Sequence, residues 1–113
     1  MHELSLCRSI LGILQEQAER HRYRRVLRVE VRVGPRAMVE PEAMIFSFGV
    51  AARGTLAEGA LLEIHPVAAR AVCLDCGCEG RVAKLAQPCR QCGSYRLLVK
   101  EDIGLRLGEI VVD

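Results

Sequence analysis

The hydrophobic positions of this chain recur with two different periods, one typical of helices and the other of strands. In residues 3–20 apolar side chains are spaced three and four positions apart, which predicts an amphipathic helix. Its apolar stripe would carry Leu6, Ile10, Ile13, Leu14 and Ala18. Residues 26–33 alternate between aliphatic and mostly charged side chains, which predicts a strand with one buried and one solvated face. The buried face would carry Leu27, Val29, Val31 and Val33.

A second helix is predicted to begin at Pro41, because proline suits the first position of a helix. Gly54 is a plausible residue to end it, since glycine readily adopts the backbone angles of a helix C-terminus. The apolar stripe of this helix would be Met44, Ile45, Phe48 and Ala52. Further strands are predicted over residues 60–67, 96–100 and 105–112. The pattern therefore predicts an α+β fold with two helices on a three-stranded sheet.

The segment 70–96 interrupts this pattern, because it holds few large apolar side chains and could not bury a core of its own. It follows one predicted strand and precedes two others, so it would be inserted into the sheet-forming part of the chain. We therefore expect residues 1–69, completed by 97–113, to form one α/β domain. Residues 70–96 would form a separate metal-binding module that resembles a zinc ribbon.

Four cysteines in that module fall into two pairs, Cys73-x-x-Cys76 and Cys89-x-x-Cys92, and a glycine follows each pair. Glycine permits the positive φ that a tight metal-binding turn often needs. Two such turns place four thiolates around one tetrahedral Zn²⁺ ion and leave no open coordination position. The spacing therefore predicts a structural zinc site. Clustering of the cysteines in a short segment also argues against a disulfide framework, which needs an oxidising compartment.

The two remaining cysteines, Cys7 and Cys78, are not expected to bind the metal. Cys78 offers an alternative to Cys76 as a zinc ligand, but Cys76 has the same spacing from Cys73 as the second pair has internally. We therefore expect Cys78 to be a bystander thiol. Cys7 lies in the first predicted helix, where we expect it to pack rather than react.

Composition and charge exclude several functions. The net charge of +2 is too small to indicate a polyanionic partner, and no apolar run approaches the roughly 18 residues of a membrane span. The first residues lack the basic and apolar segments of a signal peptide, so we expect a cytoplasmic protein. An enzyme is not expected, because no nucleophile, base and orienting group come together in the pattern, and His65 is expected at the surface of a strand.

Two functions remain possible for a small protein whose fold is stabilised by zinc. One is a nucleic-acid-binding zinc ribbon, whose phosphate contacts would come from the basic run at residues 20–25. That run lies outside the cysteine module, which argues against it. The other alternative is an adaptor protein that uses zinc only for its fold.

The sequence starts with Met1-His2-Glu3, a group of donors that could hold a second metal. The α-amine of Met1 with the amide nitrogen and imidazole of His2 can close two adjacent chelate rings on one ion, and Glu3 could add a further ligand. Such a nitrogen-rich, square-planar set suits Ni²⁺ or Cu²⁺. The site requires a free α-amine on Met1.

Taken together, these features resemble the HypA/HybF family of hydrogenase nickel-incorporation proteins. The resemblance rests on Met1-His2-Glu3, Gly34, the stretches 39–43 and 54–60, and the two cysteine pairs, so it covers essentially the whole chain. It implies a metallochaperone, not an enzyme, with a nickel-binding α/β domain and a zinc module. Its nickel ligand would be His2, together with Met1 and Glu3, and its function would be to help insert nickel into the large subunit of [NiFe] hydrogenase.

The resemblance also implies a further ligand and partners. Glu40 occupies the place of an acidic residue that some family members use for nickel, although a negative charge there would equally suit the N-terminus of the second helix. The implied partners are a nickel-handling GTPase and the hydrogenase large subunit, with no nucleic acid or membrane. This chain has no phosphate-binding glycine loop, so GTP hydrolysis would belong to the partner. A monomer or a homodimer would be compatible with this function.

Overall fold

The computed structural model describes residues 2–113, and the chain divides into two compact units. The first unit consists of Met1–Val31, Val39–Ile64 and Leu107–Asp113, and the second of Arg32–Met38 and His65–Arg106. Each unit is therefore assembled from segments that are not contiguous in the sequence. None of the helices within residues 2–113 has the length and apolar character that crossing a membrane requires.

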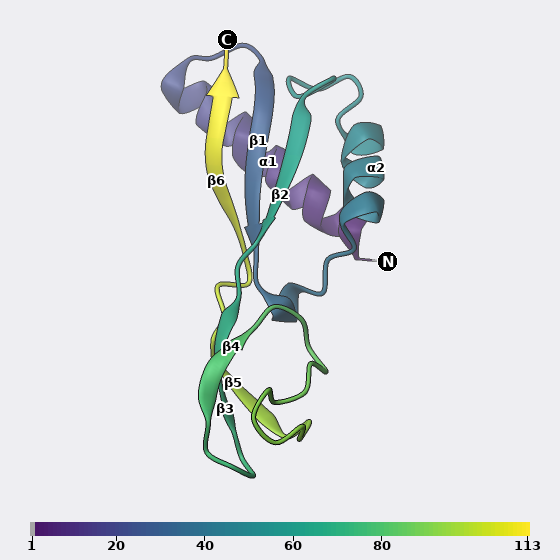
Figure 1. Cartoon of the computed structure of the whole chain (residues 1–113). Coiled ribbons are helices and arrows are strands. Elements are labelled where there is room, and N and C mark those ends of the chain that lie inside the picture. Colours follow the sequence, from purple (N-terminus) through teal and green to yellow (C-terminus); the bar gives the residue numbers. More distant parts are fainter. Residues whose placement is uncertain (1) are drawn as a thin grey trace. The chain divides into compact units, whose positions relative to one another are not determined.

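The first unit is built on a three-stranded sheet with the strand order β2-β1-β6 (Figure 1). Its strands are β1 (Val26–Val33), β2 (Leu61–Pro66) and β6 (Leu105–Val112), and its helices are α1 (Glu3–His21) and α2 (Pro41–Ala51). Figure 1 shows α1 crossing one face of this sheet, and α1 also packs against α2. The predicted arrangement of two helices with a three-stranded sheet is confirmed.

Strand directions follow from hydrogen bonds at the strand ends. Arg24 N–H donates to Asp113 O and Asp113 N–H donates to Arg25 O, so β6 runs antiparallel to β1. Figure 1 shows β2 running in the same direction as β1, with α2 between them in the sequence. A helix that connects two parallel strands in this way is the usual β-α-β crossover.

The core of this unit is mainly aliphatic, as the sequence predicts, although it includes Phe48. Three positions that were expected in it are exposed, among them Ile45 of α2 at 49%. Val29, Val31 and Val33 are buried on one face of β1. Leu27 is 45% exposed and Val26 is buried instead, because Val26 N–H donates to Leu56 O and the start of the strand is bound to that loop. In α1 the buried line is Glu3, Cys7, Ile10 and Leu14, whereas Ile13 is 43% exposed.

The second unit contains a separate antiparallel sheet of β3 (Ala69–Cys73), β4 (Glu79–Val82) and β5 (Leu97–Glu101), in the order β4-β3-β5. The sequence does not predict β3 and β4, because they are short and lack large apolar side chains. β5 is predicted as a strand, but it pairs with β3 and not with the first sheet. The second unit therefore extends beyond the predicted 70–96 on both sides.

A short 3₁₀ helix at Pro35–Ala37 belongs to this second unit and is held by Asp102. The carboxylate of Asp102 accepts Arg36 N–H and Gly104 N–H, both at 2.8 Å, and Gly34 N–H donates to Gly104 O at 2.7 Å. A Cβ at Gly34 would lie 2.8 Å from Asp102 Cγ and would overlap its carboxylate oxygen. Gly34 is therefore required by close packing, since its own φ of −87° suits any residue.

We expect Gly34→Ala to destabilise the fold by about 1–3 kcal/mol, because the added methyl displaces Asp102 and disrupts two hydrogen bonds worth about 0.5–1.5 kcal/mol each. A lowered midpoint of thermal unfolding of the zinc-loaded protein would show this. The matched control is Gly12→Ala in α1: apart from the helix's own backbone, no atom of the described residues lies within 4 Å of a Cβ there. That variant should be more stable by about 0.5–1 kcal/mol. Equal midpoints for the two variants would contradict the packing explanation.

Candidate metal centres

The four predicted zinc ligands lie on two turns with the same hydrogen bonding. Gly77 N–H donates to Cys73 O at 2.9 Å, and Gly93 N–H donates to Cys89 O at 2.8 Å. Gly77 and Gly93 have φ of +77° and +78°, a conformation that side-chain-bearing residues rarely adopt. The glycine after each cysteine pair is thus needed to close the turn, as the sequence predicts.

The sulfur atoms of Cys73, Cys76, Cys89 and Cys92 all lie within 4.8 Å of one another. The Sγ atoms of Cys73 and Cys92 are 3.6 Å apart, and those of Cys76 and Cys89 are 3.7 Å apart. Four ligands in a tetrahedron with metal–sulfur bonds of about 2.3 Å would be separated by about 3.8 Å. The cluster therefore has a spacing compatible with a tetrahedral metal such as zinc.

Backbone amides inside the turns favour the thiolate form of the first cysteine of each pair. Cys76 N–H lies 3.4 Å from Cys73 Sγ, and this bond is the main reason that the pKa of the Cys73 thiol is lowered to about 6. The N–H groups of Cys92 and Gln91 likewise lower the pKa of Cys89. Because metals bind thiolates and not thiols, these bonds prepare the ligands for an ion.

The two turns are also joined by a polar bridge that sequence analysis missed. Asp75, between the first two cysteines, pairs with Arg96 at 2.6 Å and accepts a hydrogen bond from the Ser94 hydroxyl. Ser94 and Arg96 follow the second cysteine pair, so the bridge connects the two halves of the site. The only sequence signal is a charged residue within a Cys-x-x-Cys spacer, which is too common to be diagnostic.

The other two cysteines lie outside this cluster. Cys78 is exposed, and its Sγ lies 3.6 Å from Glu79 O. Cys7 is fully buried in α1, where its thiol lies 3.5 Å from Met44 O and burial raises its pKa to about 11. A buried thiol that stays protonated packs rather than reacts, as expected from the sequence.

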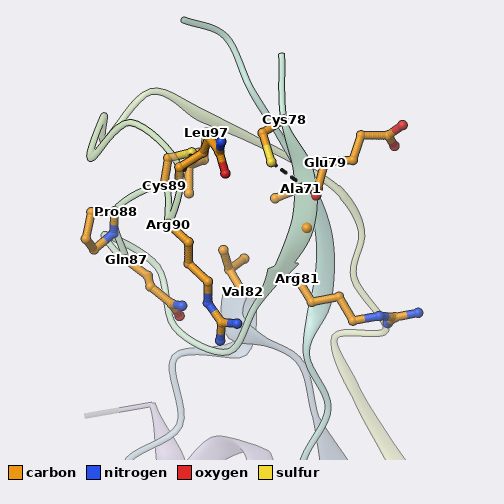
Figure 2. Close-up of a pocket in the computed structure, with 12 residues that line it drawn as sticks. Ala71, Cys78, Glu79, Arg81, Val82, Gln87, Pro88, Cys89, Arg90 and Leu97 are labelled. Carbon is orange, nitrogen blue, oxygen red and sulfur yellow. Dashed lines mark hydrogen bonds between the residues drawn. The ribbon is translucent and has the colours of Figure 1, made fainter. Parts of the chain in front are cut away.

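A pocket of about 610 Å³ lies beside Cys89 in the second unit (Figure 2). Ala71, Val82 and Leu97 provide its apolar lining. Figure 2 shows the Arg90 side chain extending across it near Val82, and Cys78 at its edge. Within residues 2–113, the one group of side chains that could hold a metal is the four-cysteine cluster, and Cys89 of that cluster lines this pocket.

The N-terminal donors lie at the start of α1. His2 is the N-cap of this helix, and Leu6 N–H donates to His2 O at 3.1 Å. The carboxylate Oε2 of Glu3 lies 3.9 Å from His2 Nδ1 and accepts Glu40 N–H at 3.1 Å. The structure therefore brings His2, Glu3 and the backbone of Glu40 together, while Met1 lies outside the described residues.

Glu3 and Glu40 both have structural roles in the first unit. The side chain of Glu3 is 6% exposed, against 48% for His2, so one donor of the motif is buried rather than displayed. The carboxylate of Glu40 accepts Glu42 N–H at 3.2 Å and caps α2. The negative charge of Glu40 therefore lies at the N-terminus of α2, as in the alternative role given for it above. Its carboxylate is not gathered with His2 and Glu3 into a ligand cluster among the described residues.

Comparisons with known proteins agree with these features. The sequence model of the family described as "Hydrogenase/urease nickel incorporation, metallochaperone, hypA" matches residues 1–112. The hydrogenase maturation factor HypA of Acidithiobacillus ferrooxidans is 47% identical over 113 residues, which is all of both chains. The hydrogenase maturation factor HybF of Klebsiella pneumoniae is 45% identical over 107 residues, 95% of each chain.

Solved structures show the same fold. The solution structure of the Ni metallochaperone HypA from Helicobacter pylori superposes with a TM-score of 0.67 and covers 99% of this chain and 97% of its own. A second solution structure of a HypA protein gives a TM-score of 0.64 and covers 99% of this chain and 96% of its own. The sequence identities are 23% and 22%, so these two likenesses concern the fold alone.

We expect Cys76→Ser to lose zinc to a competing chelator, because removal of one thiolate leaves an incomplete tetrahedral site. Cys78→Ser is the matched control, because its thiol is two residues away but outside the sulfur cluster. It should retain as much zinc as the wild type when metal content is measured by mass spectrometry after dialysis. Equal zinc loss in both variants would show that Cys78, and not Cys76 alone, serves as a ligand.

Proposed function

Because this chain belongs to the HypA family of hydrogenase and urease nickel-incorporation metallochaperones, we propose that it binds Ni²⁺ at its N-terminus and helps insert it into the large subunit of a [NiFe] hydrogenase. The observation that supports this most directly is the position of the Glu3 carboxylate, 3.9 Å from His2 Nδ1. A carboxylate held beside an imidazole at a chain terminus is a suitable start for a cation site.

The backbone nitrogen that the proposed site requires belongs to His2, at the start of α1. The first N–H groups of an α-helix have no intrahelical acceptor, and His2 is the N-cap. Its amide nitrogen can therefore ligate nickel without the loss of a helical hydrogen bond. With the α-amine of Met1 and the imidazole of His2, it completes three nitrogen donors, a set that suits a square-planar Ni²⁺ ion.

Glu3 and Glu40 contribute in different ways to this proposed site. Glu40 N–H holds one oxygen of the Glu3 carboxylate, which orients the buried side chain toward His2. Second-shell hydrogen bonds of this kind orient metal ligands and tune their affinity. Glu3 is therefore proposed as a ligand or charge partner of the nickel. Glu40 acts mainly through its amide, because its carboxylate already caps α2.

The four-cysteine cluster is proposed to hold zinc in a purely structural role. A site with four thiolates has no open position for a further ligand, so this cluster would not carry the transported ion. We infer a carrier rather than a catalyst, which receives or passes nickel by ligand exchange. A nickel-handling GTPase and the hydrogenase large subunit are the proposed partners, and nucleotide hydrolysis would occur in the GTPase.

We expect His2→Ala to abolish stoichiometric nickel binding and to leave the zinc content unchanged, because His2 belongs to the first unit and the four cysteines belong to the second. Calorimetric titration of untagged protein with Ni²⁺, combined with metal analysis, measures both quantities. His21→Ala at the other end of α1 is the matched control and should bind nickel like the wild type. Loss of both metals in His2→Ala, or undiminished nickel binding, would refute the assignment.

The roles proposed for the two glutamates predict different effects of the same substitution. Glu3→Gln keeps an oxygen that can accept Glu40 N–H but removes the charge, so nickel affinity should fall by about tenfold or more. Glu40→Gln keeps both the amide and an oxygen that can cap α2, so the affinity should remain that of the wild type. Titration of both variants with Ni²⁺ tests this. An equal loss in both would make the Glu40 carboxylate a ligand in its own right.

A further inference from the structure

The pocket beside Cys89 has the size and the composition of a binding site for a small ligand. Its volume of about 610 Å³ lies within the roughly 300–1,000 Å³ of typical ligand pockets. Ala71 and Val82 are buried in the sheet behind it, and Leu97 packs against them. We call this cavity the Arg90 pocket, after the charged side chain that extends across it (Figure 2).

The floor of the Arg90 pocket is open at Gly80, which lies in the edge strand β4. Gly80 is directly opposite Ala71 in the ladder between β3 and β4, so a side chain at Gly80 would lie on the same face of the sheet as Ala71. Apart from its two chain neighbours, no atom of the described residues lies within 4 Å of a Cβ at Gly80. The missing side chain therefore leaves room for a ligand against the sheet.

The polar side chains of the pocket place N–H donors at one end. Figure 2 shows Arg90 and Gln87 extending toward the end near Val82, away from Cys89. Within residues 2–113 the Arg90 guanidinium has no ion-pair partner. Gln87 Oε1 accepts Ala83 N–H at 3.1 Å, which leaves the Gln87 Nε2 group to donate. This end of the pocket therefore offers donors and a positive charge to a ligand.

The other charged groups around the pocket do not neutralise Arg90. Glu79 pairs with Arg70 at 3.1 Å, and Figure 2 shows its carboxylate pointing away from the pocket, as does the Arg81 guanidinium. Four metal-bound thiolates would add negative charge, but Cys89, the one that lines the pocket, lies at the end opposite the Arg90 guanidinium (Figure 2). An anionic group is therefore stabilised at the Arg90 end.

We propose that the Arg90 pocket is a binding site for a carboxylate that carries an aliphatic group. The two carboxylate oxygens would accept paired N–H groups of Arg90, whose planar fork matches their geometry, and a further one from Gln87. The aliphatic group would lie over Gly80, against Ala71 and Leu97. Free short-chain acids and the C-terminal residues of protein chains both have this chemistry. The site lies wholly within the second unit and is separate from the proposed nickel site.

Titration of zinc-loaded protein with three probes tests this chemistry, with the backbone amide shifts of Gly80 and Val82 in NMR spectra as the readout. Hexanoate represents a free acid, N-acetyl-leucine represents a chain end, and N-acetyl-leucinamide has the same body without the charge. We expect saturable shifts with one or both acids, and binding at least about tenfold tighter than that of the amide, because the amide lacks the charged acceptor.

The pattern across the probes also identifies the source of the carboxylate. Binding of hexanoate without N-acetyl-leucine would indicate a free acid, and the reverse would indicate a chain end. Binding of both would support the shared chemistry. Equal affinity for N-acetyl-leucine and its amide, or no saturable shift with either acid, would overturn the proposal.

Two pairs of variants show whether the probes bind in this pocket. Gly80→Leu fills the pocket from its floor and should abolish binding, whereas Gly80→Ala adds one methyl in open space and should retain it. Arg90→Gln removes the charge and should raise the dissociation constant by about tenfold or more. Arg81→Gln is its matched control, because the Arg81 side chain points away from the pocket, and should bind like the wild type (Figure 2).

Zinc content, measured on each variant, separates loss of the pocket from loss of the fold. None of the four substitutions replaces a cysteine of the cluster, so all should keep the wild-type zinc content. Arg90 and Arg81 are exposed, so their comparison is informative even where Gly80→Leu loses zinc. Equal affinities of Arg90→Gln and Arg81→Gln would contradict the proposal. Full binding by a zinc-loaded Gly80→Leu protein would contradict it as well.

Discussion

The convergence of four sulfur atoms is the constraint on which the second unit depends. The buried aliphatic core of its sheet consists of Ala69, Ala71 and Val82, with Leu97 and Val99 packed against it. So few small side chains bury little apolar surface, and a structural zinc ion contributes about 10–16 kcal/mol of folding free energy in peptides of comparable simplicity. Three features bring the four sulfur atoms together. They are the positive φ of Gly77 and Gly93, the hydrogen bonds from backbone N–H groups to sulfur, and the ion pair between Asp75 and Arg96.

Much of this architecture could be predicted from the sequence, because its signals are local. The Cys-x-x-Cys pairs, the alternation in β1 and Pro41 at the start of α2 each encode their structure within a few residues. What could not be predicted depends on contacts between distant segments. The pairing of β5 with β3 and the burial of Val26 in place of Leu27 are set by neighbours that no short pattern reveals. The same holds for the hydrogen bond from Glu40 N–H to the Glu3 carboxylate. The Met1-His2-Glu3 motif alone does not indicate that the Glu3 side chain is buried.

The first residue of the α2 start has two structural roles. Its N-cap, Glu40, orients Glu3 through its backbone N–H and caps the helix through its side chain. Because one residue does both, the position of the Glu3 carboxylate depends on how α2 begins.

The interleaved division of the chain also has a consequence for its synthesis on the ribosome. β1 lies between β2 and β6 in its sheet, and Glu109 of β6 is 79 positions after Glu30 of β1. One edge of β1 therefore stays without its strand partner until β6 has left the exit tunnel, and an unpaired strand edge invites association with other nascent chains. The cysteine turns, whose ligands lie within residues 73–92, can close earlier. The supply of a metal for these cysteines during translation would thus influence how well ordered the second unit is when the final strand arrives.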